Sequence, residues 1–283
     1  MAEIVAITAL SHAPGLTGWP DRATEAERKA LFDGFAEVGQ IVRAAKPDVI
    51  IGVANDHLLN FPLNNVPDFC VGTAAHWKGP AEWFRDWLNV PPYSLPGHAQ
   101  VAKTLVREGG RNGINFAFSD ELMFDDNWSV PLKFLTPDYD VPLVPIHMNC
   151  IVPPVPAPER CLEVGRAIAR IVRDSLPASM RVAIMATGGL SHDPGGPKYF
   201  DVDEEFDRWF LALLEDGDSA RVVREATVER MMAAGDGGTT ELLAWIAALG
   251  AAGGWKARTI CYEPSRALRC GMGAMVWDGG HRA

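Results

Sequence analysis

The chain has 283 residues, of which 48% are hydrophobic and 22% charged, and its formal net charge is −10. This composition is typical of a globular protein with a sizeable core, and the length fits one large α/β domain or one domain with an appended lobe. Lys and Arg are scattered along the chain, which argues against nucleic acid or an anionic membrane as the main partner.

Strand-like and helix-like segments alternate along the first half of the chain. The apolar run Ile4–Leu10 predicts a strand, and a capping-box pattern at Thr24 predicts a helix that ends before Pro47. Asp48–Ala54 predicts a second, buried strand. Residues 60–97 are rich in Pro, Asn and Trp without clear periodicity, so they predict long loops over one face of the domain.

The second half of the chain continues this alternation. Its predicted elements are a short helix at His98–Arg107, strands at Ile114–Phe118 and Val141–His147, an amphipathic helix from Cys161 to Val172, a buried strand at Val182–Met185, helices at Phe206–Leu214 and Thr239–Leu249, and strands at Ala257–Tyr262 and Ala274–Trp277. Pro142 and Pro145 predict that the strand at 141–147 is an edge or irregular strand. The pattern predicts a single α/β domain over residues 1–283, with a central, mostly parallel sheet flanked by helices.

Targeting and cysteine patterns indicate a cytoplasmic protein. Met1–Leu10 has no basic segment before its short apolar run, unlike a signal peptide, and no apolar stretch is long enough to span a bilayer. The five cysteines are odd in number and form no C-x-x-C pair, which favours reduced thiols over a disulfide framework or a zinc knuckle.

Three histidines, His12, His57 and His192, each follow a predicted strand by a few residues. In a parallel α/β sheet such positions gather at the carboxyl edge of the strands, where ligands and catalytic groups are normally held. A single histidine at a strand end often only caps a loop. The repeated placement favours a metal or acid–base site at this edge.

Residues around His192 and Glu241 extend this interpretation. His192 lies in a Gly-rich loop, where Asp193 would orient or charge the imidazole for acid–base chemistry; the alternative is an ordinary loop between strand and helix. Glu241 opens a predicted helix, where the helix dipole alone favours a carboxylate, but beside two histidines it is a candidate third metal ligand. Two His and one carboxylate are typical of mononuclear non-haem Fe(II) oxygenases, and zinc hydrolases use the same set.

An ordered set of motifs carries a family resemblance. The motifs are Ser11-His12-Ala13-Pro14, Asn55-Asp56-His57, Thr187-Gly188-Gly189-Leu190-Ser191-His192, and Glu241 ahead of Trp245, with further likeness at Pro96-Gly97-His98, Val130-Pro131-Leu132, Glu159-Arg160-Cys161 and Gly273-Ala274-Met275. Together they resemble the class III extradiol ring-cleavage dioxygenases over nearly the whole chain, with the protocatechuate 4,5-dioxygenase β subunits as the closest likeness.

The resemblance implies specific roles for four residues. His12, His57 and Glu241 would bind Fe(II), and His192 would be the acid–base residue that helps to deprotonate a vicinal diol before O2 insertion opens the ring. A zinc-dependent hydrolase on the same scaffold is the alternative enzyme. A third class, a non-catalytic binding module, would have no need to keep all four residues.

The chain departs from the family pattern at Asp126. Relatives usually carry the motif Asp-His-Gly ahead of Pro-Leu. In this chain the position of that histidine is occupied by Asp126 or Asn127. A carboxylate accepts a hydrogen bond, so we expect a substrate with a donor there: a dihydroxypyridine (hydroxypyridone), or a protocatechuate- or gallate-like phenol with an extra hydroxyl. The alternative is a loop that differs only in packing, with Asp126 solvated. Arg266 and Arg269 are candidates for binding a substrate carboxylate.

The resemblance also bears on partners. Protocatechuate members of the family work with a small helical α subunit that covers the pocket, and this chain carries no such extension. Either a separate lid subunit closes the site, or residues 60–97 and the partner protomer of a homo-oligomer do so. Trp77, Trp83 and Trp87 in that segment would then line the pocket, or they only pack. The expected ligands are a small aromatic substrate and O2.

Overall fold

Four parallel strands form the centre of the main sheet in the computed structural model, which describes residues 1–279. The strands of this sheet are β1 (Glu3–Leu10), β2 (Val49–Asn55), β3 (Phe69–Gly72), β6 (Ala117–Ser119), β7 (Leu143–Met148), β8 (Arg181–Thr187), β9 (Lys256–Ser265) and β10 (Cys270–Asp278). Their order across the sheet is β6-β3-β7-β2-β8-β1-β10-β9. Strands β7, β2, β8 and β1 run parallel, whereas β10 pairs antiparallel with β1 and β9.

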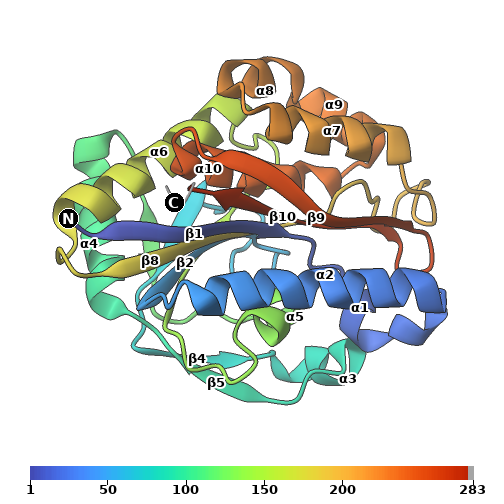
Figure 1. Ribbon diagram of the computed structural model, residues 1–283, viewed down its shortest axis with the longest axis horizontal. Helices are drawn as coiled ribbons and strands as arrows, with labels where there is room; N and C mark the ends of the chain where they lie inside the picture. Colours follow the sequence, from blue (N-terminus) through green and yellow to red (C-terminus); the bar gives the residue numbers. More distant parts are fainter. Residues whose placement is uncertain (280–283) are drawn as a thin grey trace.

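Helices cover both faces of this sheet (Figure 1). They are α1 (Gly15–Gly18), α2 (Glu25–Ala44), α3 (Arg85–Leu88), α4 (Ala99–Gly109), α5 (Asp126–Leu135), α6 (Pro158–Ser175), α7 (Glu204–Asp216), α8 (Ser219–Glu225), α9 (Val228–Ala234) and α10 (Leu242–Ala252). The short 3-10 helices are η1 (Pro20–Arg22), η2 (Glu82–Phe84), η3 (Gly110–Asn112) and η4 (Thr239–Glu241). One apolar core lies under α4, α6, α7 and α10, and a second lies under α2 and α5. The predicted single α/β domain with a mostly parallel central sheet is confirmed.

The packing of α10 against α6 fixes the helix that follows Glu241. Helix α10 is buried along its whole length, as its apolar sequence demands. Gly165 of α6 lets the two backbones touch, because a Cβ there would lie 1.9 Å from the carbonyl oxygen of Ala247. Gly250 allows the same close approach to Leu162. These two contacts therefore hold α10 closely against α6.

Strand β7 lies inside the sheet, so its predicted place at an edge is wrong. It pairs with β2 along six residues, but β3 pairs only with Ile146, His147 and Met148 on the other side. Pro145 precedes that short pairing, and its missing N–H therefore costs no hydrogen bond to β3. Proline is tolerated here because the neighbouring strand is short.

Residues 60–97 are more regular than the sequence predicts. They contain β3, the hairpin-like pair β4 (His76–Gly79) and β5 (Tyr93–Pro96), and α3. Trp77 of β4 is buried and donates its Nε1–H to the carbonyl oxygen of Leu143. Of the predicted strand at Ile114–Phe118, only the last two residues lie in a strand, because β6 begins at Ala117. The capping box at Thr24 is confirmed, with both of its hydrogen bonds present.

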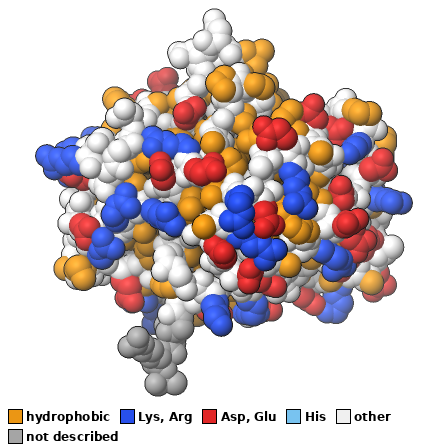
Figure 2. Space-filling model, turned by 90° about the horizontal axis from the view of Figure 1, so that it is seen from above, with side chains coloured by type: hydrophobic (Ala, Val, Ile, Leu, Met, Phe, Trp, Pro, Cys, Tyr) orange, Lys and Arg blue, Asp and Glu red, His pale blue; other side chains and the backbone are white. Residues whose placement is uncertain are grey.

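The face drawn in Figure 2 carries charges of both signs. Acidic and basic side chains are intermingled there, with hydrophobic side chains between them. Across residues 1–279, no helix combines the length and apolar character needed to cross a membrane.

Candidate active site

Three side chains from separate elements meet at the carboxyl edge of β1 and β2. His12 follows β1, His57 follows β2, and Glu241 is the last residue of η4. Nε2 of His12 lies 3.2 Å from Oε2 of Glu241, and Nε2 of His57 lies 2.9 Å from Oε1 of the same carboxylate. The edge position that the sequence predicts therefore brings these three residues into contact.

Contacts on the far side of each imidazole leave the two Nε2 atoms free to act as ligands. Nδ1 of His12 contacts the hydroxyl of Thr187, and that hydroxyl donates at 2.9 Å to the carbonyl oxygen of Asn127, so it accepts the imidazole N–H. Nδ1 of His57 lies 3.1 Å from a carboxylate oxygen of Asp125. Within the described chain, the buried Nε2 of His12 has no hydrogen-bond partner. A metal ligand needs this tautomer and this second contact.

Negative charge exceeds positive charge in this buried site. Burial raises the pKa of Glu241, but the neighbouring histidines outweigh it and hold that pKa well below its ordinary value. Burial lowers the pKa of His57, but Asp125 and Asp126 outweigh it and raise that pKa well above its ordinary value. His12, His57 and Asp126 also offer ligand atoms within 4.8 Å of one another. Such an environment favours a bound cation.

His192 is oriented as a base. Its Nδ1 lies 2.8 Å from the carbonyl oxygen of Leu190, which can only accept, so the ring proton is on Nδ1 and Nε2 is the proton acceptor. That Nε2 lies 3.8 Å from Glu241. Burial lowers the pKa of His192 and keeps the ring neutral near pH 7. The orienting group is this backbone carbonyl and not Asp193, whose carboxylate accepts the backbone N–H of Lys198.

Asp126 and Asn127 begin helix α5 and have different surroundings. Asp126 is only 7% exposed and lines the cavity beside the histidines, with Oδ1 3.5 Å from Nδ1 of His57. The alternative of a solvated Asp126 is therefore wrong. Burial raises the pKa of Asp126 to about 6. The Asn127 amide instead donates at 2.8 Å to the carbonyl oxygen of Asn55, which gives it a structural contact under the site.

The site opens into a cavity of about 270 Å³. Its lining includes the five residues of the site, together with Trp19, Trp87, Tyr199 and Arg269. Arg269 lies over the rings of Trp19 and Tyr199 and donates to the Tyr199 hydroxyl. Arg266 is exposed in the turn before it. Of the three tryptophans of residues 60–97, Trp87 lines the cavity, Trp77 is buried in the core and Trp83 is 63% exposed.

Three supporting groups were not predicted from the sequence. They are Thr187, Asp125 and the backbone N–H of Gly189, which donates at 2.7 Å to Oε2 of Glu241. Asp125 also caps α5 by accepting the backbone N–H of Asn127. Its place directly ahead of a predicted helix is the signal that would have identified it. Thr187 ends β8, and only the pairing of β8 with β1 brings it to His12.

Comparison with known proteins identifies the family. Residues 6–272 match the model of the catalytic LigB subunit of aromatic ring-opening dioxygenase. The chain is 30% identical over 226 residues to a 2,3-dihydroxyphenylpropionate/2,3-dihydroxicinnamic acid 1,2-dioxygenase of Photorhabdus laumondii, covering 79% of this chain and 67% of that protein. A relative of the same name from Klebsiella pneumoniae is 26% identical, covering 94% of this chain and 96% of that protein.

A solved structure agrees with the fold. The uncharacterized protein JW3007 from Escherichia coli K12 aligns with a TM-score of 0.60 and 16% identity, covering 97% of this chain and all of that one. The expected resemblance to extradiol dioxygenases is confirmed at the level of the family, while the closer likeness to protocatechuate 4,5-dioxygenase β subunits stays a prediction. This protein belongs to the family of catalytic LigB subunits of aromatic ring-opening dioxygenases.

Proposed function

We propose that this ring-opening dioxygenase is an extradiol enzyme that holds Fe(II) with His12, His57 and Glu241. The observation that carries the proposal is the convergence of the Nε2 atoms of two histidines on one buried carboxylate. The donor set of two imidazoles and a carboxylate fits Fe(II). When bound, the iron would bring a vicinal diol and O2 together and pass electron density between them.

The protein's own groups would control the proton and the orientation of the diol. Nε2 of His192 faces the cavity as an acceptor, so it would take a proton from a substrate hydroxyl. Asp125 and Thr187 would keep both ligand imidazoles in the required tautomer. The Gly189 N–H and the Asn55 amide would keep the Glu241 carboxylate ionised and fixed.

The substrate would be a vicinal dihydroxy aromatic with a hydrogen-bond donor facing Asp126. Near pH 7 the Asp126 carboxyl is mostly ionised and would accept that donor. A dihydroxypyridine (hydroxypyridone) supplies a ring N–H, and a protocatechuate- or gallate-like phenol supplies a further hydroxyl. Arg269 lines the same cavity and would bind a substrate carboxylate, a group that the substrates named for the relatives also carry.

The remaining features of the proposal concern the whole chain. Residues 1–283 would form one catalytic domain that works as a homo-oligomer, with the site closed by the partner protomer or a separate lid subunit. All five cysteines are free thiols, which supports a cytoplasmic enzyme. A zinc hydrolase is not favoured, because the family and the similar proteins are dioxygenases.

The test is O2 uptake by protein loaded anaerobically with Fe(II), with zinc-loaded protein as the control. The panel would contain protocatechuate, gallate, catechols and dihydroxypyridines. We expect uptake with loss of the aromatic absorbance for at least one compound, with iron only. Equal product from the zinc-loaded protein without O2 would contradict the proposal and favour the hydrolase.

A further inference from the structure

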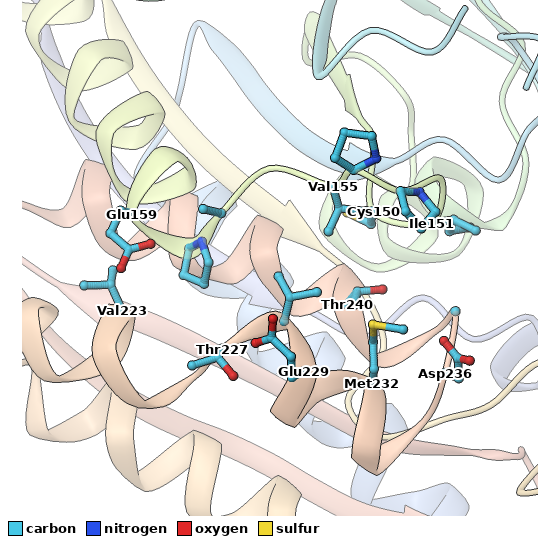
Figure 3. Close-up of a pocket in the computed structure, with 16 residues that line it drawn as sticks. Cys150, Ile151, Val155, Glu159, Val223, Thr227, Glu229, Met232, Asp236 and Thr240 are labelled. Carbon is cyan, nitrogen blue, oxygen red and sulfur yellow. The ribbon is translucent and has the colours of Figure 1, made fainter. Parts of the chain in front are cut away.

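A second cavity adjoins the catalytic one and has no part in the chemistry described above. It is a groove of about 480 Å³ between the loop 150–158 and helix α9. In Figure 3 it extends from Ile151 and Asp236 at one end to Glu159 and Val223 at the other. Ile151 and Gly237 line both the groove and the catalytic cavity. The groove and the catalytic cavity therefore lie on either side of these two residues.

A buried polar group at the catalytic end of the groove lacks a partner. Thr240 lines the groove, is 3% exposed, and its hydroxyl has no hydrogen-bond partner among the described residues. It directly precedes Glu241, the carboxylate between the two histidines. A buried hydroxyl without a partner is unfavourable unless a ligand or water satisfies it. The Thr240 hydroxyl thus points to a polar atom held in this part of the groove.

The rest of the groove is apolar, with acidic groups at its edge. Its walls include three prolines and three further apolar side chains, namely Pro153, Pro154, Pro158, Val223, Val228 and Met232. Glu159, Glu229 and Asp236 are exposed and line the same groove, whose lining contains no Lys, Arg or His. This combination stabilises apolar groups and cations and disfavours a carboxylate.

We propose that this groove is a second substrate subsite, which binds an apolar, non-anionic substituent of the aromatic ring. The inference rests on the proposed function, because the ring must occupy the catalytic cavity for its substituent to reach the groove. The hydroxyl of Thr240 binds a polar atom near the ring, the apolar walls bind the chain beyond it, and Glu159 lies where a terminal amine would end. Arg269 lines only the catalytic cavity, so the two binding regions select opposite charges.

The experiment compares catechol with alkylcatechols from methyl to octyl, each cleaved by the Fe(II)-loaded full chain. Burial of each added methylene should raise kcat/KM about threefold to fourfold until the groove is full. A chain that ends in an amine should do at least as well as the alkyl chain, and one that ends in a carboxylate should have a kcat/KM about threefold lower. Glu159→Lys should reverse the order of amine and carboxylate.

Met232→Trp blocks the groove at an exposed position on α9. This variant should cleave catechol as the wild type does and lose the gain with chain length. Ala233→Trp is the matched control on the same helix, because Ala233 is exposed and outside the groove lining, and it should keep the gain. A chain-length gain that survives Met232→Trp, or no gain in the wild type, would overturn the proposal.

Turnover of unsubstituted catechol separates the two proposals. If catechol is cleaved but chain length has no effect, the groove proposal fails and the proposed function stands. If no catechol is cleaved, the proposed function fails for catechols. Calorimetric affinities of the same compounds for the Fe(II)-loaded protein under nitrogen then decide the groove proposal by the same chain-length and Met232→Trp comparison.

Discussion

Nε1 of Trp128 donates a hydrogen bond of 2.9 Å to Nε2 of His147. Because Nε2 of His147 accepts this hydrogen bond, the ring proton of His147 is on Nδ1. That Nδ1 lies 3.2 Å from Oδ1 of Asp56. All three side chains are buried, and Asp56 directly precedes His57. A chain of polar contacts beneath the sheet edge therefore supports the segment that carries a candidate metal ligand.

His147→Phe should destabilise the fold. It leaves the Trp128 N–H buried without a partner and leaves the buried Asp56 carboxylate with Asn60 alone, which costs about 3 kcal/mol of unfolding free energy. Urea unfolding followed by fluorescence measures the change. His76→Phe is the control, because His76 is exposed, and it should change the unfolding free energy by less than about 0.5 kcal/mol. Equal stability of the two variants would show that the buried contacts contribute little.

Substitutions at the site should separate metal binding from proton transfer. His12→Ala and Glu241→Ala should each lose Fe(II) and all turnover, because each removes a ligand atom from the converging set. His192→Ala should keep its iron and lose about 10²–10⁴-fold in kcat, the usual contribution of acid–base catalysis. Iron content after gel filtration, measured beside kcat, distinguishes the two classes. Loss of iron from His192→Ala would show that His192 is a ligand and not the base.

Asp126→His should shift substrate preference towards simple catechols. The buried carboxylate accepts a donor from the substrate, whereas an imidazole tolerates rings that lack one. The ratio of kcat/KM for a dihydroxypyridine to that for catechol should fall about tenfold or more. Asp126→Asn is the matched variant, since it keeps the size of the side chain and removes the charge. A ratio that stays constant in both would assign Asp126 to packing alone.

Gly189→Ala should impair catalysis while the fold survives. A Cβ at this position would lie 2.5 Å from Cε1 of His192, too close for the ring to keep its place. Displacement of a catalytic group by about 1 Å lowers kcat about 10²-fold. Gly110→Ala is the control, because the nearest atom to its Cβ would be 3.9 Å away. Wild-type kcat in Gly189→Ala would show that the His192 ring can act from a different position.

Asp207 should make stability depend on pH between about 4 and 6. It is buried under Ser191 and Tyr262, and burial raises its pKa to about 6 from 3.8. The folded state therefore binds the proton more tightly, so this contribution is fully present below pH 4 and is lost as pH rises through 6. The loss is on the order of 3 kcal/mol. Urea midpoints across this range should be flatter for Asp207→Asn, and those of the exposed variant Asp278→Asn should follow the wild type.

Local patterns predicted most of the elements, and tertiary contacts explain the remainder. Apolar runs and the Thr24 cap marked strands and helices because these signals act within a few residues. The interior place of β7 escaped prediction, because it depends on how far a neighbouring strand extends. The sequence also did not predict that Arg269 lines the cavity whereas Arg266 is exposed. Arg269 adopts a positive φ of 64° at the end of the turn, and the structure places it among the cavity residues.

The position of β1 between β8 and β10 has a consequence for the order of assembly. Its two hydrogen-bonded neighbours come from the middle and the last part of the chain. A ribosome that has synthesised only the first half has therefore made His12 and His57 but neither the strands that flank β1 nor the carboxylate at Glu241. Assembly of the proposed metal site must then wait until most of the chain has been translated.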